Sequence, residues 1–116
     1  MNLQTEREFF ITFEDKQRKN LFGYCRLRFP SESLSEEITS KSSLIRELHV
    51  VGTAAGIGDE GKIQHKGLGK KLLIKAEEIS KKHGKNKVIV ISGIGVRDYY
   101  RKYNYVLQGH YMVKFF

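Results

Sequence analysis

The stretch IQHKGLGKKLL (residues 63–73) places Gly67 and Gly69 one residue apart, directly before an amphipathic run. Across residues 68–82 apolar side chains recur every three or four positions and lysines occupy the other face, which predicts a helix. The first N–H groups of such a helix attract anions, and a glycine lets phosphate oxygens approach the backbone. Two interpretations stay open here: a phosphate-binding turn, or a glycine-rich loop that ends where a helix begins.

The flanking segments predict the strands that this helix connects. Residues 43–52 (SLIRELHVVG) are a strong strand candidate, and residues 87–92 (KVIVIS) form the continuous apolar run of a strand covered on both faces. Gly84 in KKHGK supplies the C-terminal stop of the helix. Strand, glycine turn, helix and buried strand together predict a right-handed βαβ crossover.

The outer segments extend this unit into a mixed α/β sheet. Residues 8–14 and 21–29 are rich in aromatic and β-branched residues and flank a polar turn, which predicts an antiparallel hairpin. The polar residues 31–43 are expected to form a surface loop with at most one helical turn. A short helix around residues 96–103 then precedes two final strands in residues 105–116.

Composition limits the possible partners and the compartment. The 116 residues predict a single domain spanning 1–116, and a formal net charge of +8 favours anionic partners such as nucleic acid or a phosphorylated cofactor. The one cysteine, Cys25, excludes a disulfide framework and any metal site built on several thiols, and no other spacing suggests a metal site. Without a long apolar run or a signal peptide, a soluble cytoplasmic protein without membrane contact is expected.

The glycine turn fits one nucleotide-binding pattern and not two others. Leu72 stands where G-x-G-x-x-G requires its third glycine, and Lys71 stands where a P-loop requires Ser or Thr. Gln64 to Gly69 do match [Arg/Gln]-x-x-Gly-x-[Gly/Ala]. That pattern is the pyrophosphate-binding signature of the GCN5-related N-acetyltransferase (GNAT) family, which binds acetyl-CoA.

A more specific resemblance covers residues 44–116. LIRELHVVG, QHKGLGKKLL and ISGIGVRDYYRKYNYVLQGHYMVK are together similar to the C-terminal GNAT domain of the catalytic subunit of Elongator, the enzyme that modifies the wobble uridine of tRNA. The resemblance implies a mostly antiparallel mixed sheet with flanking helices. It also implies that the acetyl group is used for a carboxymethyl-type modification at ring carbon 5 of that uridine.

Two departures from the family are expected to matter. Family members usually carry an upstream radical domain with a cysteine-bound iron–sulfur cluster and S-adenosylmethionine, which a chain with one cysteine cannot hold. The chain also starts at what would be the second strand of the GNAT fold, without the usual first strand and first two helices. An excised domain or a stand-alone relative of a longer enzyme is therefore expected.

The resemblance assigns the acetyl-CoA site to two segments and a tyrosine. The strand before the glycine turn splays from the buried strand and pairs with the pantetheine arm, while amides of the turn hold the pyrophosphate. The implied cofactor-binding residues are Glu47, Leu48, His49, Val50, Gln64, Lys66, Gly67, Leu68, Gly69, Lys70 and Tyr100. Leu48 and Val50 can serve the core at the same time, and exposed lysines such as Lys66 and Lys70 can simply be solvated.

A tyrosine is the implied proton donor to the departing thiolate. Tyr100-Arg-Lys-Tyr-Asn-Tyr105 meets the family pattern Tyr-x-Lys-x-x-aromatic, so Tyr100 is the candidate general acid. Neighbouring helix positions point about 100° apart, so Tyr99 is expected to keep its hydroxyl in water. A base is harder to assign: Glu47 and His49 share a strand face unless a bulge intervenes, but an ordinary polar pair explains them equally well.

The basic surface is compatible with tRNA. Arg97, Arg101 and Lys102 are the candidate phosphate contacts, and the lysines on the outer helix face are either further contacts or a solvated surface. Two alternatives to the tRNA-directed acetyltransferase remain open: a protein lysine N-acetyltransferase of the histone type, and a non-catalytic tRNA-binding module. The positive net charge argues against a basic peptide as substrate.

Overall fold

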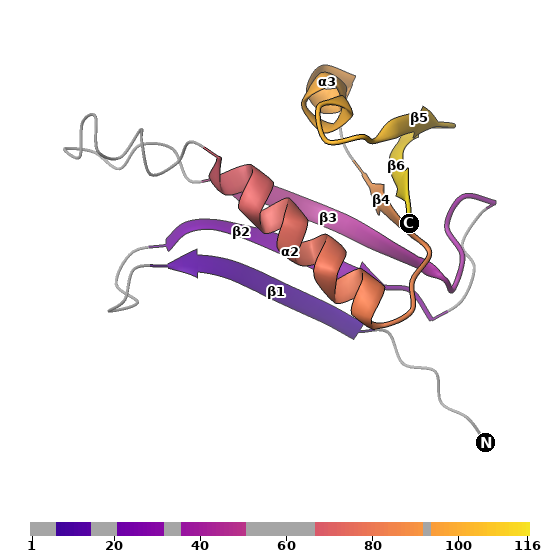
Figure 1. Cartoon of the computed structure of the whole chain (residues 1–116), viewed down its shortest axis with the longest axis horizontal. Helices are drawn as coiled ribbons and strands as arrows, with labels where there is room; N and C mark the ends of the chain where they lie inside the picture. Colours follow the sequence, from indigo (N-terminus) through magenta and orange to yellow (C-terminus); the bar gives the residue numbers. More distant parts are fainter. Residues whose placement is uncertain (1–6, 15–20, 32–35, 51–66, 92–93) are drawn as a thin grey trace.

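The structure is a computed structural model that describes residues 7–14, 21–31, 36–50, 67–91 and 94–116 (Figure 1). The predictions for residues 51–66, among them the roles of Gln64 and Lys66, lie outside the described residues.

Six strands in the described ranges form one sheet with the order β1-β2-β3-β4-β6-β5. Neighbouring strands are antiparallel except β3 and β4, which are parallel and are connected through α2 (Figure 1). The predicted mixed, mostly antiparallel sheet and its central strand–helix–strand unit are therefore confirmed. The strands are β1 (Arg7–Glu14), β2 (Leu21–Phe29), β3 (Ser42–Val50), β4 (Lys87–Val90), β5 (Val106–Gln108) and β6 (Tyr111–Phe115).

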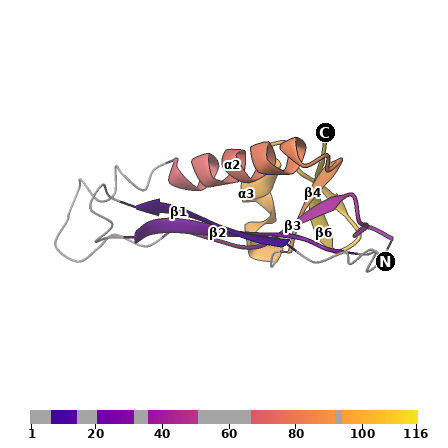
Figure 2. The same ribbon diagram turned by 90° about the horizontal axis from the view of Figure 1, so that it is seen from below.

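The long helix α2 (Leu68–Lys82) has the predicted bounds. It begins at Gly67, whose φ of 78° lies in the left-handed region that favours glycine. It ends at His83 and Gly84, and lysines in its last turn suit the negative end of the helix dipole. Figure 2 shows α2 lying along one face of the sheet, over β1, β2 and β3.

The sheet face under α2 forms the main core. Alternate residues of β2 point toward the helix, and the apolar stripe of α2 packs on them, as the sequence periodicity predicts. Burying each large apolar side chain contributes roughly 1.5–3 kcal/mol, so this contact fixes the helix on the sheet. The core residues include Cys25, Leu27, Phe29, Ile45, Leu68, Leu72, Leu73, Ala76, Val88, Val90, Tyr100, Tyr105 and Met112.

A second, smaller cluster corrects the expectation for residues 31–43. Ile38 is only 5% exposed and packs with Leu44, Ile89 and Val113. The segment is thus anchored by its one buried isoleucine, since burial of that side chain outweighs the polar character of its neighbours. Its described residues, 31 and 36–43, contain no helix, and the last two of them already belong to β3.

Two short helical elements follow β4. These are η1 (Ile94–Val96) and α3 (Arg97–Arg101), which together confirm the helix predicted around residues 96–103. In Figure 1, α3 lies beyond the end of β4, and its Tyr99 side chain reaches the first turn of α2. The start of α2, the end of β3 and α3 therefore surround one point of the molecule.

Candidate functional site

A cleft opens where β3 and β4 part. The two strands pair only from Ser42 to Ile45, and the last bond between them runs from the Ile91 N–H to the Ile45 carbonyl at 3.2 Å. β3 continues to Val50 without β4 beside it. The space between them, which we name the strand cleft, has a volume of about 410 Å³. Its walls are Arg46, Glu47, Leu48, Val50, Ile91, Val96, Tyr99 and Tyr100.

A β-bulge stands at the point where the cleft begins. Arg26 of β2 pairs with Glu47 and Leu27 pairs with Ile45, so Arg46 is the extra residue and has no partner in the register of either neighbouring strand. A bulge bends its strand and redirects side chains. From Arg46 onward, the β3 edge that faces the cleft is free of strand pairing among the described residues.

Gly67 and Gly69 are required in the turn for different structural reasons. A Cβ on Gly67 would meet nothing within 4 Å, so this glycine is needed for its positive φ and not for space. A Cβ on Gly69 would collide with the Tyr99 hydroxyl, and its next neighbour from another element is Cγ2 of Val50 at 3.6 Å. What stands against Gly69 in the protein itself is therefore the tip of Tyr99.

This geometry overturns the expectation for Tyr99. The sequence predicts its hydroxyl in water, but the hydroxyl lies against the first turn of α2, because the Tyr99 side chain reaches across from α3. The rings of Tyr99 and Tyr100 are perpendicular with centroids 5.2 Å apart, and both line the strand cleft. Tyr100 is 6% exposed and packs edge-on against Tyr105.

Burial sets the protonation state of both phenols. It raises the pKa of Tyr99 and of Tyr100 to about 12 in each case, because the phenolate would lose its hydration. Each hydroxyl stays protonated near neutral pH and can donate a hydrogen bond or a proton into the cleft. Burial likewise raises the pKa of Cys25 to about 12, so this thiol is an inert core residue.

Glu47 and His49 do share a face, because the bulge precedes Glu47. This is the sheet face that α2 does not cover, whereas Leu48 and Val50 pack against the core. The Glu47 carboxylate accepts a hydrogen bond from Tyr24 Oη at 2.8 Å and lies 3.6 Å from Arg26 Nη1. That hydrogen bond is the largest cause of the raised pKa of Tyr24.

No direct signal in the sequence pointed to Tyr24 and Arg26. Both occupy alternate positions of β2 that look like ordinary outward-facing residues. Only the β2–β3 register brings them to Glu47, and a bulge that shifts this register is not visible in the sequence.

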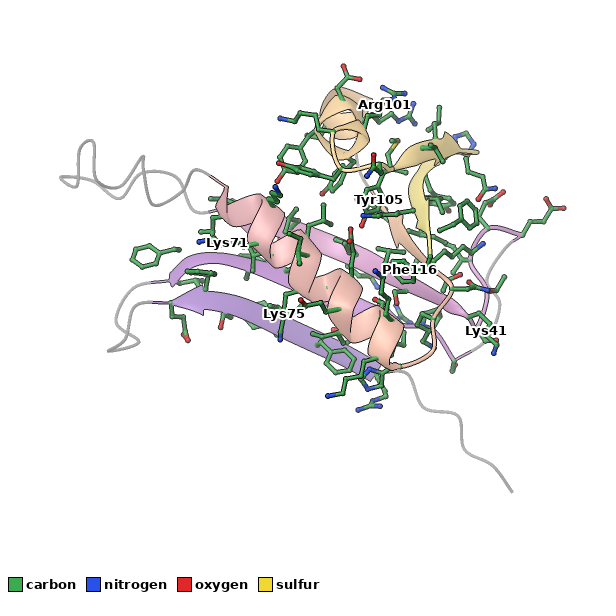
Figure 3. All side chains as sticks on the ribbon, in the orientation of Figure 1. Lys41, Lys71, Lys75, Arg101, Tyr105 and Phe116 are labelled. Carbon is green, nitrogen blue, oxygen red and sulfur yellow. The ribbon has the colours of Figure 1, made fainter. Side chains whose placement is uncertain are left out.

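A second cavity, which we name the helix cleft, lies between α2 and the turn that joins α3 to β5. It has a volume of about 280 Å³ and is lined by Lys70, Leu73, Ile74, Glu77, Lys102, Tyr103, Asn104 and Lys114. Glu77 is buried, where it accepts hydrogen bonds from Tyr105 Oη at 2.8 Å and Lys114 Nζ at 3.1 Å. Figure 3 shows Tyr105 reaching from the C-terminal part of the chain toward α2.

The three predicted RNA contacts lie in different surroundings. Lys102 lines the helix cleft, with Nζ 5.3 Å from the centre of the Tyr99 ring. Arg101 forms an ion pair with Asp98 on the solvent-exposed side of α3, where Figure 3 labels Arg101. Arg97 is half-buried and its Nε has no hydrogen-bond partner among the described residues.

Neither a metal site nor a membrane span is found in the described residues. They contain no group of three or more His, Cys, Asp and Glu side chains that could hold a metal ion. None of their helices is long and apolar enough to cross a bilayer.

Sequence comparisons connect the chain to tRNA-modifying proteins. No protein-family model matches it. It is 47% identical over 112 residues to Elongator complex protein 3 of Schizosaccharomyces pombe and 44% identical over 112 residues to the tRNA uridine(34) acetyltransferase of Methanocaldococcus jannaschii. These matches cover 92% and 93% of this chain but 21% of each relative. The chain thus spans about a fifth of the length of these curated relatives.

Solved structures give the same connection. The archaeal Methanocaldococcus infernus Elp3 with an N-terminal deletion is similar with a TM-score of 0.80 at 37% identity, covering 97% of this chain and 29% of that one. An acetyltransferase from Bacillus cereus reaches 0.71 at 19% identity, covering 97% and 76%. A GNAT family acetyltransferase from Brucella melitensis in complex with acetyl-CoA reaches 0.55 at 15% identity, covering 84% and 52%. The last two show the fold alone.

The sheet that opens between β3 and β4, with α2 beginning beside the opening, is the fold of a GNAT-type acetyltransferase. Within this class, the chain is a homologue of the C-terminal portion of Elongator complex protein 3 and the tRNA uridine(34) acetyltransferases. The resemblance predicted from the sequence is confirmed.

Proposed function

We propose that this chain is an acetyl-CoA-binding acetyltransferase domain that acts in the modification of tRNA wobble uridine. The observation that carries the proposal is the strand cleft: it has an unpaired strand edge on one side and a buried tyrosine at its base, and the start of a helix stands at its other end. The sequence similarity to tRNA uridine(34) acetyltransferases supports the choice of acceptor.

The pantetheine arm would lie along β3 in the strand cleft. Its amides can pair with the backbone of residues 47–50, which β4 leaves free. Two apolar walls of the cleft support this, because Ile91 and Val96 are 46% and 47% exposed and a bound chain would cover them. The thioester would then lie toward Arg46 and Tyr100, and the pyrophosphate toward Val50.

The pyrophosphate would meet the first turn of α2. Val50 lies beside Gly69, so a chain that follows β3 arrives at the N–H groups of Leu68, Gly69 and Lys70. Gly67 supplies the backbone conformation that starts this turn. The adenosine end would continue into the helix cleft, where Lys70 and Lys102 offer positive charge and Tyr103 offers a ring.

Tyr100 would act as the general acid. As water or a nucleophile of the acceptor bonds to the thioester carbonyl carbon, the bond between that carbon and sulfur breaks. The departing thiolate takes a proton from the Tyr100 hydroxyl, and the proton that the nucleophile loses restores the phenol. The raised pKa of Tyr100 keeps that proton in place near neutral pH. Backbone N–H groups of β3 beyond Ile45 would polarise the thioester carbonyl in the same region.

The product of the proposed modification is a carboxymethyl-type group at carbon 5 of the uridine. The single cysteine of this chain cannot hold an iron–sulfur cluster, so the radical step that uses S-adenosylmethionine would take place elsewhere in the modifying enzyme. A tRNA substrate would also place the protein in the cytoplasm. The positive net charge gives no support to a basic peptide as acceptor.

Binding and turnover test the proposal separately. We expect acetyl-CoA to bind with a measurable heat in calorimetry, and we expect release of free CoA thiol to depend on added tRNA. A folded protein that binds no acetyl-CoA would overturn the proposal. Acetylation of lysine peptides without any effect of tRNA would show that the acceptor is a protein lysine and not tRNA.

A further inference from the structure

Arg46 occupies a special position in the cleft. It is the bulged residue of β3, it follows the last residue that pairs with β4, and its side chain lines the strand cleft together with Tyr100. It therefore stands at the end of the cleft where β3 and β4 meet. A bulge at such a place commonly serves to redirect a side chain next to a site.

The charge of Arg46 is not compensated by its neighbour. The adjacent carboxylate, Glu47, is already engaged by Tyr24 and Arg26 on the uncovered sheet face. Arg46 itself forms no ion pair with any residue in the described part of the chain, and it is exposed. Apart from Arg46 and the already engaged Glu47, the walls of the cleft are neutral, so the guanidinium of Arg46 is available to an anion.

That anion is not the pyrophosphate of the cofactor. Gly69 and the first turn of α2 lie beside Val50, and four residues of extended strand, about 13 Å, separate Val50 from Arg46. A cofactor with its phosphates at the start of α2 therefore brings its reactive end to Arg46. An anionic group that meets Arg46 belongs to the molecule that receives the acyl group.

We propose that Arg46 binds a backbone phosphate of the RNA acceptor at the end of the strand cleft where β3 and β4 meet. The planar guanidinium can donate two parallel hydrogen bonds to one phosphate, which fixes the acceptor in position as well as attracting it. This inference rests on the proposed function and adds an acceptor-binding residue to it. Arg46 thus separates acceptor binding from cofactor binding within one cleft.

The test compares R46Q with K75Q in the full chain. Lys75 is also an exposed cation, with Nζ 3.8 Å from a Glu78 carboxylate oxygen, but it lines neither cleft and lies on α2, as Figure 3 shows. We expect R46Q to raise the dissociation constant of an unmodified tRNA transcript about 10-fold and to leave acetyl-CoA affinity unchanged. The slope of log affinity against log salt should decrease by about 0.7 to 0.9, the value of one phosphate contact.

The R46K variant separates the charge of Arg46 from its planar hydrogen-bonding geometry. Lysine keeps the charge without the planar fork, so the salt slope should return while affinity recovers only in part. Equal effects of R46Q and K75Q on tRNA binding would overturn the assignment. A loss of acetyl-CoA affinity in R46Q, or a preference of the wild type for malonyl-CoA that R46Q abolishes, would also overturn it. Wild-type protein that binds no acetyl-CoA would instead refute the proposed function on which it rests.

Discussion

The strand cleft and the helix cleft lie on either side of Tyr99 and are built from different chemistry. The strand cleft has mostly apolar walls, an unpaired strand edge and two protonated phenols. Its charged residues are Glu47, which Tyr24 and Arg26 engage, and Arg46, which forms no ion pair among the described residues. The helix cleft has three lysines, one of them paired with the buried Glu77. Tyr99 connects the two clefts, since it lines the strand cleft and its ring centre lies 5.3 Å from the ring centre of Tyr103 in the helix cleft.

This difference suggests a division of work along one cofactor. Apolar walls that a bound cofactor covers strengthen a hydrogen bond to a reacting atom, because water does not compete there. Lysines in an open cleft add affinity for phosphate but cannot take part in a reaction at the other end. Substitutions in the strand cleft should therefore change rate, and those in the helix cleft should change affinity.

The largest expected effect is on rate, at Tyr100. Tyr100→Phe keeps the ring packed on Tyr105 and removes only the hydroxyl. Release of free CoA thiol, measured with and without tRNA, should slow by roughly 10- to 1000-fold, while acetyl-CoA affinity in calorimetry changes little. If Tyr99→Phe cripples the rate and Tyr100→Phe is silent, the roles of the two tyrosines are exchanged.

The pH dependence follows from the pKa of Tyr100. A general acid works in its protonated form, which is present below its pKa, and burial raises that pKa to about 12. The contribution of Tyr100 to thiol release should therefore be flat between about pH 6 and 9 and fall only as the pH approaches 12. A decrease in the wild type that begins near pH 7 and disappears in Tyr100→Phe would contradict this protonation state.

The next effect is on affinity, at the boundary between the clefts. Gly69→Ala places a Cβ where the Tyr99 hydroxyl lies, so it should displace Tyr99 and weaken acetyl-CoA binding about 10-fold. Adding Tyr99→Phe removes the colliding oxygen and should restore most of the affinity. Without rescue, the added methyl obstructs the cofactor itself, which is the original interpretation of Gly69 as a phosphate-binding glycine.

Gly67→Ala is the matched control for this pair. A Cβ at Gly67 meets nothing, but the positive φ strains any residue other than glycine by about 1–2 kcal/mol. Thermal or denaturant unfolding should detect this loss of stability. Tyr99→Phe should not relieve it.

The contrast between the glycines also shows what the sequence could predict. Periodicity predicted the bounds of α2, and the apolar run of residues 87–92 predicted β4, because both signals are local. The motif placed Tyr100 in the cleft with the end of β3. The contact of Tyr99 with Gly69 could not be predicted, since it depends on how the fold positions α3 relative to the first turn of α2.

Long-range register accounts for the other omissions. The periodicity of α2 assigns no role to Glu77, but the C-terminal segment brings Tyr105 and Lys114 to it and buries it. Arg46 had no role in the sequence interpretation because a bulge is defined by two strands together and not by one. Both residues depend on pairings between segments far apart in the chain.

The smallest effect is expected in the helix cleft, from the 3′-phosphate of CoA. Lys70 and Lys102 are exposed, and an exposed ion pair contributes about 0.2–1 kcal/mol to binding. The wild type should therefore bind acetyl-CoA about 2- to 5-fold more tightly than acetyl-dephospho-CoA, which lacks that phosphate. Lys70→Gln and Lys102→Gln should each reduce this ratio toward one, with an unchanged rate of thiol release at saturation, whereas Lys75→Gln should leave the ratio intact. Calorimetry at low and high salt measures this affinity ratio, which should be smaller at high salt because salt screens an exposed ion pair. A ratio of one in the wild type would place the adenosine outside the helix cleft, and a lower saturated rate in either variant would show that the two clefts do not divide affinity from chemistry.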